Sequence, residues 1–545
     1  MQRRDSMKKE NSLIKAGAVL VVSGFIVKLL SAFYRIPLTR MLGAAQMGRY
    51  SAVFSLFMPF FSFATAGIVP CISHFSAKLY SGKDETALVH LRRTAMKLYI
   101  AAAAAAAAAF VVFGYFYSKR QGEMLFFAGS IILAPNILFA VSENICKGIT
   151  QGRMDMLPTA VANVIESVFK TCAGLAAVWY INSIVKPADK DTAVAAVLFT
   201  VTAAGFICCI YLLAVLKMNR VRTQKNIKAK HRKKRTPSVT ASQLYRISFP
   251  IAVSALVISV ANFFDTAVCL PRIDKIPYRQ IVESFGGASF KNAQDMSMYL
   301  LGIYQGMVLT VFNLFPAVMS SAGSATLPVV SRLFSSGDMA AAQKQLEKVF
   351  SFTAAVSLPA MVYIFIFRCD ILSFLFGMNG AQTQVAARLL AILLSSGVFC
   401  CFVSVFNSVL YAAGKSDTVF SILVKASAVR CIVNYVLCAV PGINIKAFAV
   451  SGSIFYTIIF ILSAKSIKKL NINFSLTGIF LLPCAAAAVS GLSICIVTDR
   501  MLCWLPVFLR LFFSAVIFFL IYILILIAAG FRLISADENS KIYKE

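Results

Sequence analysis

The chain has 545 residues, of which 59% are hydrophobic and only 14% are charged, and its mean hydropathy is +0.79. Soluble proteins carry roughly a quarter charged residues, so this composition excludes an ordinary soluble enzyme or binding domain. A net charge of +31 would suit a nucleic-acid-binding protein. In so apolar a chain it indicates membrane topology and attraction to anionic lipids instead, and no nucleic-acid partner is expected.

Apolar stretches of about 20 residues recur along the whole chain, each long enough to cross roughly 30 Å of hydrocarbon as a helix. The first stretch is too long for the apolar region of a signal peptide, and no small-residue cleavage site follows it, so we expect a retained helix. The predicted fold is therefore all-α and polytopic, with fourteen transmembrane helices near residues 13–34, 50–73, 94–117, 124–146, 156–181, 192–216, 247–270, 298–320, 349–368, 387–411, 418–440, 446–464, 477–497 and 505–529.

The loops predict the orientation of these helices. Lys and Arg concentrate in the alternate loops that face the cytoplasm if the N-terminus lies there, which is the arrangement that the positive-inside rule favours. With an even number of spans the C-terminus is cytoplasmic too. The longest of these loops contains the basic run Lys228–Arg235, which is typical of a segment that lies on an anionic membrane surface.

The sequence repeats itself weakly. Gly48-Arg-Tyr50 precedes an apolar helix, and Gly302-Ile-Tyr304 precedes another in the second half of the chain. Gln151-Gly-Arg153 and Ala413-Gly-Lys415 recur at nearly the same offset, with the same number of helices between. Six helices return the chain to its starting side, so both halves enter the membrane in the same sense. Parallel repeats of this kind are used by alternating-access transporters.

These features predict four regions. Residues 1–216 form an N-terminal lobe of six helices, and residues 217–246 form a basic cytoplasmic linker. Residues 247–464 form a C-terminal lobe of six helices, and residues 465–545 contain two further helices and a cytoplasmic tail.

Several cations fall inside predicted spans, where a charge is costly unless it faces a cavity or a partner. Lys28 and Arg35 are seven residues apart in the first span and so share one helical face. Lys425 and Arg430 both lie in the eleventh span. We interpret these four residues as the lining of a central substrate cavity.

Three acids also fall within spans: Glu143, Glu166 and Asp265. The first two have a Lys four residues later and can form internal ion pairs. Asp265 has Asn262 one helical turn before it instead. Asp265, Asn262 and Glu166 are the candidate ion-coupling residues.

The cations within or near the spans outnumber the acids, and this balance favours an anionic substrate. A cavity for cationic drugs needs acids, whereas a desolvated phosphate or pyrophosphate needs Lys and Arg to supply charge-assisted hydrogen bonds. Fourteen cysteines form no CxxC pair, and the three histidines lie in polar loops. Neither a metal site nor a cofactor is predicted.

Three segments carry a resemblance to a known family: the stretch 23–44 (SGFIVKLLSAFYRIPLTRMLGA), Gly48-Arg-Tyr-Ser51, and Thr65-Ala-Gly-Ile-Val-Pro70. Together they resemble the stage V sporulation protein B-like branch of the polysaccharide transporters. That branch belongs to the MOP superfamily, which also contains the MurJ-type lipid II flippases and the MATE multidrug exporters. The resemblance covers essentially the whole chain.

The resemblance implies a V-shaped bundle in a bacterial cell membrane that moves an undecaprenyl-pyrophosphate-linked saccharide from the inner to the outer leaflet. By position, Lys28 and Arg35 match the cationic cavity of MurJ-type members, and Asp265 matches an acid linked to ion coupling. H⁺ or Na⁺ is the implied coupling ion. Lys425 and Arg430 depart from the pattern of the helix that supplies sodium ligands in some members, which argues against a sodium site there.

Two alternatives follow from the same residues. The first is a MATE-type, cation-coupled multidrug antiporter that uses Asp265 or Glu166 as its coupling acid. The second is a membrane-embedded transferase, which would need a positioned base, nucleophile or metal cluster. No such constellation appears in the sequence, so the chain is not expected to be an enzyme.

Overall fold

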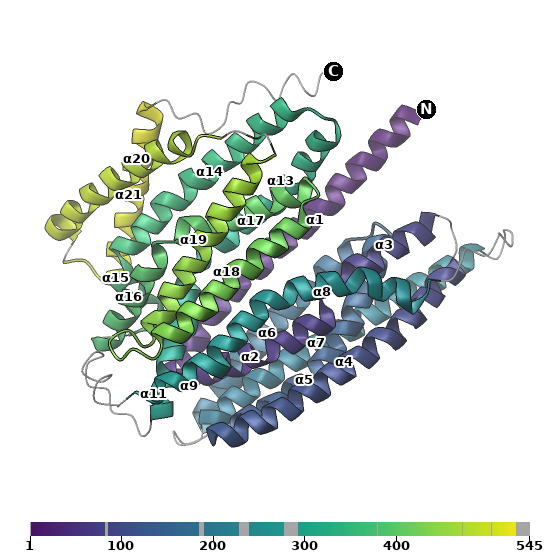
Figure 1. Ribbon diagram of the computed structural model, residues 1–545, viewed down its shortest axis with the longest axis horizontal. Coiled ribbons are helices and arrows are strands. Elements are labelled where there is room, and N and C mark those ends of the chain that lie inside the picture. The colour runs from purple at the N-terminus through teal and green to yellow at the C-terminus, as the bar shows by residue number, and fades with distance from the viewer. Residues whose placement is uncertain are drawn as a thin grey trace. The chain divides into compact units, whose positions relative to one another are not determined.

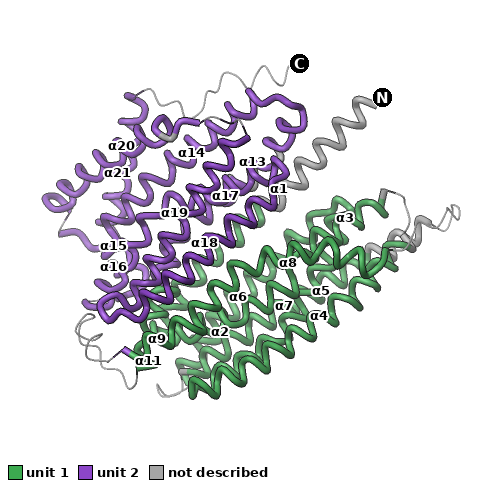
Figure 2. Tube along the Cα trace, in the orientation of Figure 1, with its two compact units in different colours: residues 1–275, 290–306 green, residues 276–289, 307–545 purple. Residues whose placement is uncertain are grey.

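The computed structural model describes residues 2–81, 85–184, 190–227, 239–276, 293–378, 380–470, 472, 474–502 and 504–529. Within these ranges the chain forms helices joined by short connections and no strand (Figure 1). The chain divides into two compact units, with residues 1–275 and 290–306 in unit 1 and residues 276–289 and 307–545 in unit 2 (Figure 2). The predicted basic run Lys228–Arg235 lies outside the described residues.

Unit 1 consists mainly of long helices, several of which carry proline in their interior. Its described helices are α1 (Gln2–Leu42), α2 (Ala44–Thr65), α3 (Ile68–Ser81), α4 (Glu85–Gln121), α5 (Met124–Gly152), α6 (Leu157–Ile184), α7 (Lys190–Ile227), α8 (Ala241–Phe264), the π-helix η2 (Asp265–Cys269), α9 (Leu270–Ile273) and α11 (Ala293–Gly302).

Unit 2 has an aromatic core in which the rings of Phe350, Phe402, Phe406 and Phe460 pack on one another, with centroids of Phe350 and Phe406 5.2 Å apart. Such tilted and edge-on pairs add to the stabilisation that burial provides. The π-helix η3 (Ile303–Val308) spans the boundary between the units. The other described helices of unit 2 are α12 (Leu309–Phe312), α13 (Leu314–Ser335), α14 (Met339–Ile366), α15 (Arg368–Phe376), α16 (Ala381–Leu394), α17 (Gly397–Ala412), α18 (Ser416–Leu437), α19 (Lys446–Lys468), α20 (Leu476–Val497), the π-helix η4 (Thr498–Leu502) and α21 (Val507–Ala528).

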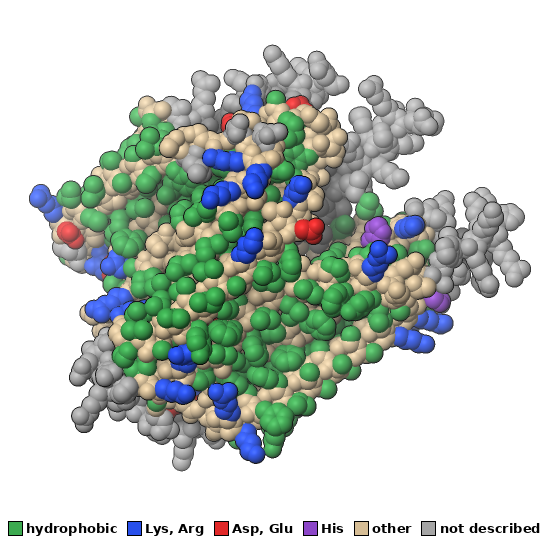
Figure 3. All heavy atoms as spheres, viewed as in Figure 1, with side chains coloured by type: hydrophobic (Ala, Val, Ile, Leu, Met, Phe, Trp, Pro, Cys, Tyr) green, Lys and Arg blue, Asp and Glu red, His purple; other side chains and the backbone are tan. Residues whose placement is uncertain are grey.

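Among the described residues, twelve helical stretches are long and apolar enough to cross a membrane, or up to fourteen when two bent pairs each count as one span. The bends measure 44° at Asn313, between α12 and α13, and 46° between α16 and α17. Large apolar side chains such as Trp179, Phe199 and Leu492 are exposed along the spans, and hydrophobic side chains cover much of the face drawn in Figure 3. The predicted all-α polytopic class is confirmed.

The first helix after the basic linker, α8, clusters with unit 1, although the predicted lobes assign it to the C-terminal half. The reason is its packing on α2, α3 and α4. Gly67 has φ +80°, and a Cβ there would lie 2.5 Å from the backbone oxygen of Ser248. The Tyr99 hydroxyl donates to the backbone oxygen of Leu244 at 3.4 Å, and the hydroxyls of Ser62 and Ser259 lie 2.8 Å apart.

Unit 1 also holds α11, the start of the eighth span, through a close crossing of α11 with α2. A Cβ at Gly48 would lie 1.8 Å from the backbone oxygen of Met298, and one at Gly302 would lie 1.7 Å from that of Ala44. One turn further, the Thr39 hydroxyl bonds the backbone oxygen of Gly306 at 3.4 Å. Only glycine permits this approach, because small residues let helix backbones come into direct contact inside a membrane.

We therefore predict that Gly302→Ala lowers the melting temperature of the detergent-solubilised protein, since its methyl group would collide with a backbone carbonyl rather than a movable side chain. Overpacking of this kind costs about 1–3 kcal/mol. The matched control is Gly24→Ala in α1, where nothing lies within 4 Å of the new Cβ. The control should melt at or slightly above the wild-type temperature, and a Gly302→Ala protein that does the same would contradict the crossing.

Candidate functional site

Lys28 and Arg35 lie on α1 in unit 1, Lys28 exposed and Arg35 half-buried. A third cation of unit 1 lies close to this helix. The ammonium of Lys170, on α6, is 5.8 Å from the ring centroid of Tyr34 and 5.5 Å from that of Phe54, within the range of cation–π attraction. Lys170 therefore lies close to Tyr34, the residue before Arg35. Among the described residues, Lys170 does not form the predicted ion pair with Glu166.

The cations of the eleventh span lie in unit 2. Lys425 on α18 is exposed, and the guanidinium of Arg430 lies 5.7 Å from the ring centroid of Phe455. One turn beyond Arg430, Asn434 is fully buried, and its side-chain oxygen accepts from the Cys438 thiol at 3.1 Å. That these residues share one cavity with the cations of α1 remains a prediction.

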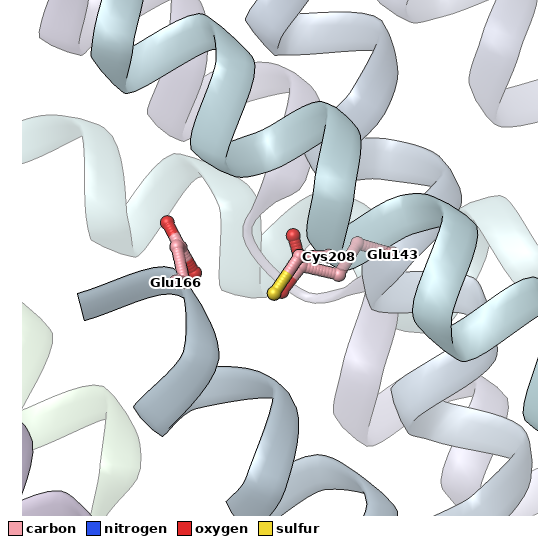
Figure 4. Close-up of side chains that lie close together, drawn as sticks. All are labelled: Glu143, Glu166 and Cys208. Atoms are coloured by element: carbon pink, nitrogen blue, oxygen red, sulfur yellow. The ribbon is translucent and has the colours of Figure 1, made fainter. Parts of the chain in front are cut away.

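A buried polar cluster connects α5, α6 and α7 inside unit 1 (Figure 4). One ligand atom each from Glu143, Glu166 and Cys208 lies within 4.8 Å of the others. Glu143, only 4% exposed, forms the predicted ion pair with Lys147, whose ammonium also donates to the Asn163 side chain at 2.6 Å.

The charges of this cluster limit what it can hold. Two carboxylates and one ammonium leave one negative charge when both acids are ionised, which a shared proton or a single monovalent cation would neutralise. The Cys208 thiol donates to the Ala162 backbone oxygen at 2.9 Å. A divalent ion would have to compete with Lys147 for Glu143, so the donor set fits a single positive charge better.

Asp265 and Asn262 lie where α8 ends. Asp265 is 2% exposed and begins the π-helix η2, and Asn262 is half-buried one turn before it. The next residue, Thr266, accepts a hydrogen bond at its backbone oxygen from the Tyr117 hydroxyl at 3.3 Å, which ties this stretch to α4. Short π-helical turns are frequent at functional sites, and here one carries a buried carboxylate.

Sequence reasoning missed an ion network near the start of α2. The guanidinium of Arg49 is 2.7 Å from the Asp295 carboxylate, 3.3 Å from Glu123 and 3.7 Å from Asp191. Its side chain is only 14% exposed. The network joins four segments that are far apart in sequence, at the end of unit 1 predicted to face outwards. Removing one partner of such a network leaves buried charge uncompensated.

Asp274 lies beside this network, just beyond the end of α9 and outside the predicted spans. Its Oδ1 is buried and makes no hydrogen bond with the described residues. Burial raises the pKa of this carboxyl to about 6, and the nearby Glu123 carboxylate adds to the rise, while the Ser297 hydroxyl opposes it. A carboxyl whose pKa is higher in the folded than in the unfolded protein costs stability as the pH rises from its unfolded pKa, about 4, to its folded pKa.

We therefore expect Asp274→Asn to raise the melting temperature at pH 8, with a gain of up to about 3 kcal/mol in the free energy of unfolding. The substitution should have little effect at about pH 3, where the carboxyl is protonated in both the folded and the unfolded protein. Thermal unfolding in detergent across this pH range measures the difference. Asp338→Asn is a control at an exposed helix cap, where the Asn side-chain oxygen can accept the same bond from the Ala341 amide, so its stability should change little at either pH. A gain for Asp274→Asn that does not vary with pH would contradict the assignment.

The comparisons with known proteins agree with this architecture. The family model described as "Polysaccharide biosynthesis protein" matches residues 13–334, and the MatE model matches residues 305–436. The chain is 19% identical over 467 residues to stage V sporulation protein B of Bacillus subtilis (strain 168), which covers 84% of each protein.

Two solved structures show the same fold at low identity. The lipid II flippase MurJ in an inward closed conformation matches with a TM-score of 0.66 and 14% identity, over 93% of this chain and 98% of that one. An inward-facing MATE-family multidrug resistance transporter matches with a TM-score of 0.63 and 11% identity, over 84% and 100%. The chain therefore belongs to the polysaccharide biosynthesis protein family and has the fold of the MOP-superfamily transporters.

Proposed function

We propose that this protein is a flippase that moves an undecaprenyl-pyrophosphate-linked saccharide from the inner to the outer leaflet of a bacterial cell membrane. The observation that carries the proposal is the set of cations on α1 and, from α6, beside it. Among the described residues, neither Arg35 nor Lys170 forms an ion pair with a carboxylate. Cations kept inside a membrane without acidic partners suit a substrate that brings its own negative charge.

The relatives support the same cargo class. The family is named for polysaccharide biosynthesis, and one solved structure with this fold is a flippase for lipid II, a lipid-linked saccharide. The similarity to a stage V sporulation protein fits a cell-envelope or spore polysaccharide precursor, lipid II included.

In the proposed mechanism the diphosphate enters from the inner leaflet and pairs with Lys28, Arg35 and, from unit 2, Lys425 and Arg430. The lipid tail stays in the bilayer. The two units then act as the lobes of an alternating-access transporter. Carrying about two negative charges outwards across about 100 mV releases on the order of 4–5 kcal/mol if no countercharge travels with them. No covalent chemistry is needed.

We expect the double variant Lys28→Ala, Arg35→Ala to reduce flipping at least about tenfold, since losing one charge-assisted hydrogen bond costs about 1.5–3 kcal/mol. The measurement is the rate at which a fluorescent undecaprenyl-pyrophosphate saccharide becomes accessible to an external quencher in proteoliposomes. Lys28→Arg should retain most of the rate. Lys465→Ala, an exposed residue on α19, is the control for loss of a cation elsewhere. A double variant with the wild-type rate would remove the basis of the proposal.

We further propose that transport is coupled to one cation, H⁺ or Na⁺, through the Glu143–Glu166 cluster, with Asp265 and Asn262 as the second candidate site. Glu166→Gln removes one negative charge and leaves the Glu143–Lys147 pair in place. We expect flipping by this variant to lose its response to an imposed ion gradient while the rate without a gradient persists. Asp265→Asn is measured in the same vesicles. Loss of the response in this variant but not in Glu166→Gln would assign the coupling to the second site. A response that survives both substitutions would rule out coupling at either.

A MATE-type antiporter for cationic drugs is the second candidate, favoured by the buried acids Glu143 and Asp265 and by the MatE match in the second half of the chain. This function would depend on the buried acids rather than on the cations of α1. Efflux of an organic cation that is lost in Asp265→Asn but survives Lys28→Ala would favour it over the flippase.

A further inference from the structure

A pocket of about 450 Å³ in unit 2 is lined by residues that none of the preceding assignments use. Its polar lining consists of Arg368, Cys369, Gln384, Arg388 and Lys446, and apolar residues of α16 complete it. We call it the basic pocket. The described residues that line it include three cations and no acid.

The fold brings these residues together from three helices. Gln384 and Arg388 lie one turn apart on a single face of α16, and Ala391 and Ile392 continue that face. Arg368 is the first residue of α15, directly after the span α14, and Lys446 is the first residue of the span α19. The basic pocket therefore lies at the ends of helices that are long and apolar enough to cross a membrane, which is where such helices meet the lipid headgroups.

Each of the three cations retains hydrogen-bond donors for a ligand. Arg368 donates one bond to the Phe365 backbone oxygen at 2.6 Å, and its guanidinium lies 4.9 Å from the ring centroid of Phe365. Lys446 donates one bond to the Gly442 backbone oxygen at 3.2 Å. Arg388 is exposed and forms no ion pair with the described residues. A guanidinium has five N–H donors and an ammonium three, so most of them are available.

The neighbouring acid does not neutralise the basic pocket. Asp370 is two residues beyond Arg368, but its carboxylate accepts from the Arg510 guanidinium at 2.6 Å. Three cations around one cavity repel one another, and an anion between them would relieve that repulsion. Phosphate suits such a site, because arginine binds it bidentately and lysine adds a compact charge.

We propose that the basic pocket binds a phosphate-bearing anion, and that its place at the ends of α14 and α19 favours the headgroup of an anionic phospholipid as the source. Basic pockets between transmembrane helices bind such headgroups. In the predicted orientation these helix ends face outwards, so the lipid would come from the outer leaflet. The site is independent of the cargo proposed above, because it shares no residue with the cavity cations.

Cys369 provides a direct test, because it lines the basic pocket and is exposed. The detergent-solubilised protein is treated with iodoacetamide, a neutral reagent, and the alkylation of individual peptides is followed by mass spectrometry. Cys172, exposed in unit 1, is an internal control in every sample. Phosphatidylglycerol at about four times its Kd should slow alkylation of Cys369 about fivefold and leave Cys172 unchanged. Net-neutral phosphatidylcholine should not protect Cys369.

Two further arms identify the source of the anion and the residues responsible. Protection by phosphatidylglycerol alone indicates a lipid site, and protection by inorganic pyrophosphate as well indicates a site for soluble anions too. Arg388→Gln with Lys446→Gln should abolish protection, whereas Lys465→Gln, near the other end of α19, should keep it. Absence of protection by either anion, equal protection by phosphatidylcholine, or protection that survives the double substitution would overturn the proposal. None of these measurements depends on flipping activity, so they test the basic pocket separately from the proposed function.

Discussion

Inside a bilayer neither a backbone amide nor a charge can rely on water, and this constraint governs the whole structure. The chain satisfies its backbone with near-continuous helices. Where a helix stops within the apolar layer, its last groups still find partners. The Ala66 amide bonds the Ser62 oxygen before Gly67 turns the chain, and the Asn313 amide bonds the Leu309 oxygen at the 44° bend. At both breaks the amide that follows the last helical turn is therefore paired with a carbonyl of that turn.

The same constraint sorts the charged side chains of the spans into groups. Some are neutralised locally, as Lys147 is by Glu143. Others lie over aromatic rings, as Lys170 does over Tyr34 and Phe54, and Arg430 over Phe455. A ring stabilises a cation without neutralising it. The cations of the second group are therefore stabilised without being neutralised by these rings, and Arg430 is one of the cavity residues that the sequence predicts.

The features that depend on one helix at a time could be predicted from the sequence. Span lengths follow from hydropathy, and the Glu143–Lys147 pair follows from its spacing of four residues. The same spacing suggested a Glu166–Lys170 pair, but the ammonium of Lys170 instead contacts rings of α1 and α2. Tertiary neighbours override a local rule when they offer the side chain a comparable partner.

Features that combine distant segments could not be predicted from one sequence. The Arg49 network needs Glu123, Asp191 and Asp295, which no periodicity relates to Arg49. The basic pocket likewise needs the start of α15, one face of α16 and the start of α19. The assignment of α8 to unit 1 depends on contacts of its small residues with α2, which a count of helices per lobe does not record.

The eighth span shows how these constraints bear on movement. Its first part, α11, is fixed to unit 1 by the glycine crossing with α2, and its last part, α13, belongs to unit 2. Between them lie the π-helix η3 and the bend at Asn313. A π-helical turn departs from the regular hydrogen-bond pattern of an α-helix, and a bend interrupts it. The chain passes from unit 1 to unit 2 within this stretch, where the helix departs from regular α-helical geometry, while the glycine contact fixes the unit 1 side of it.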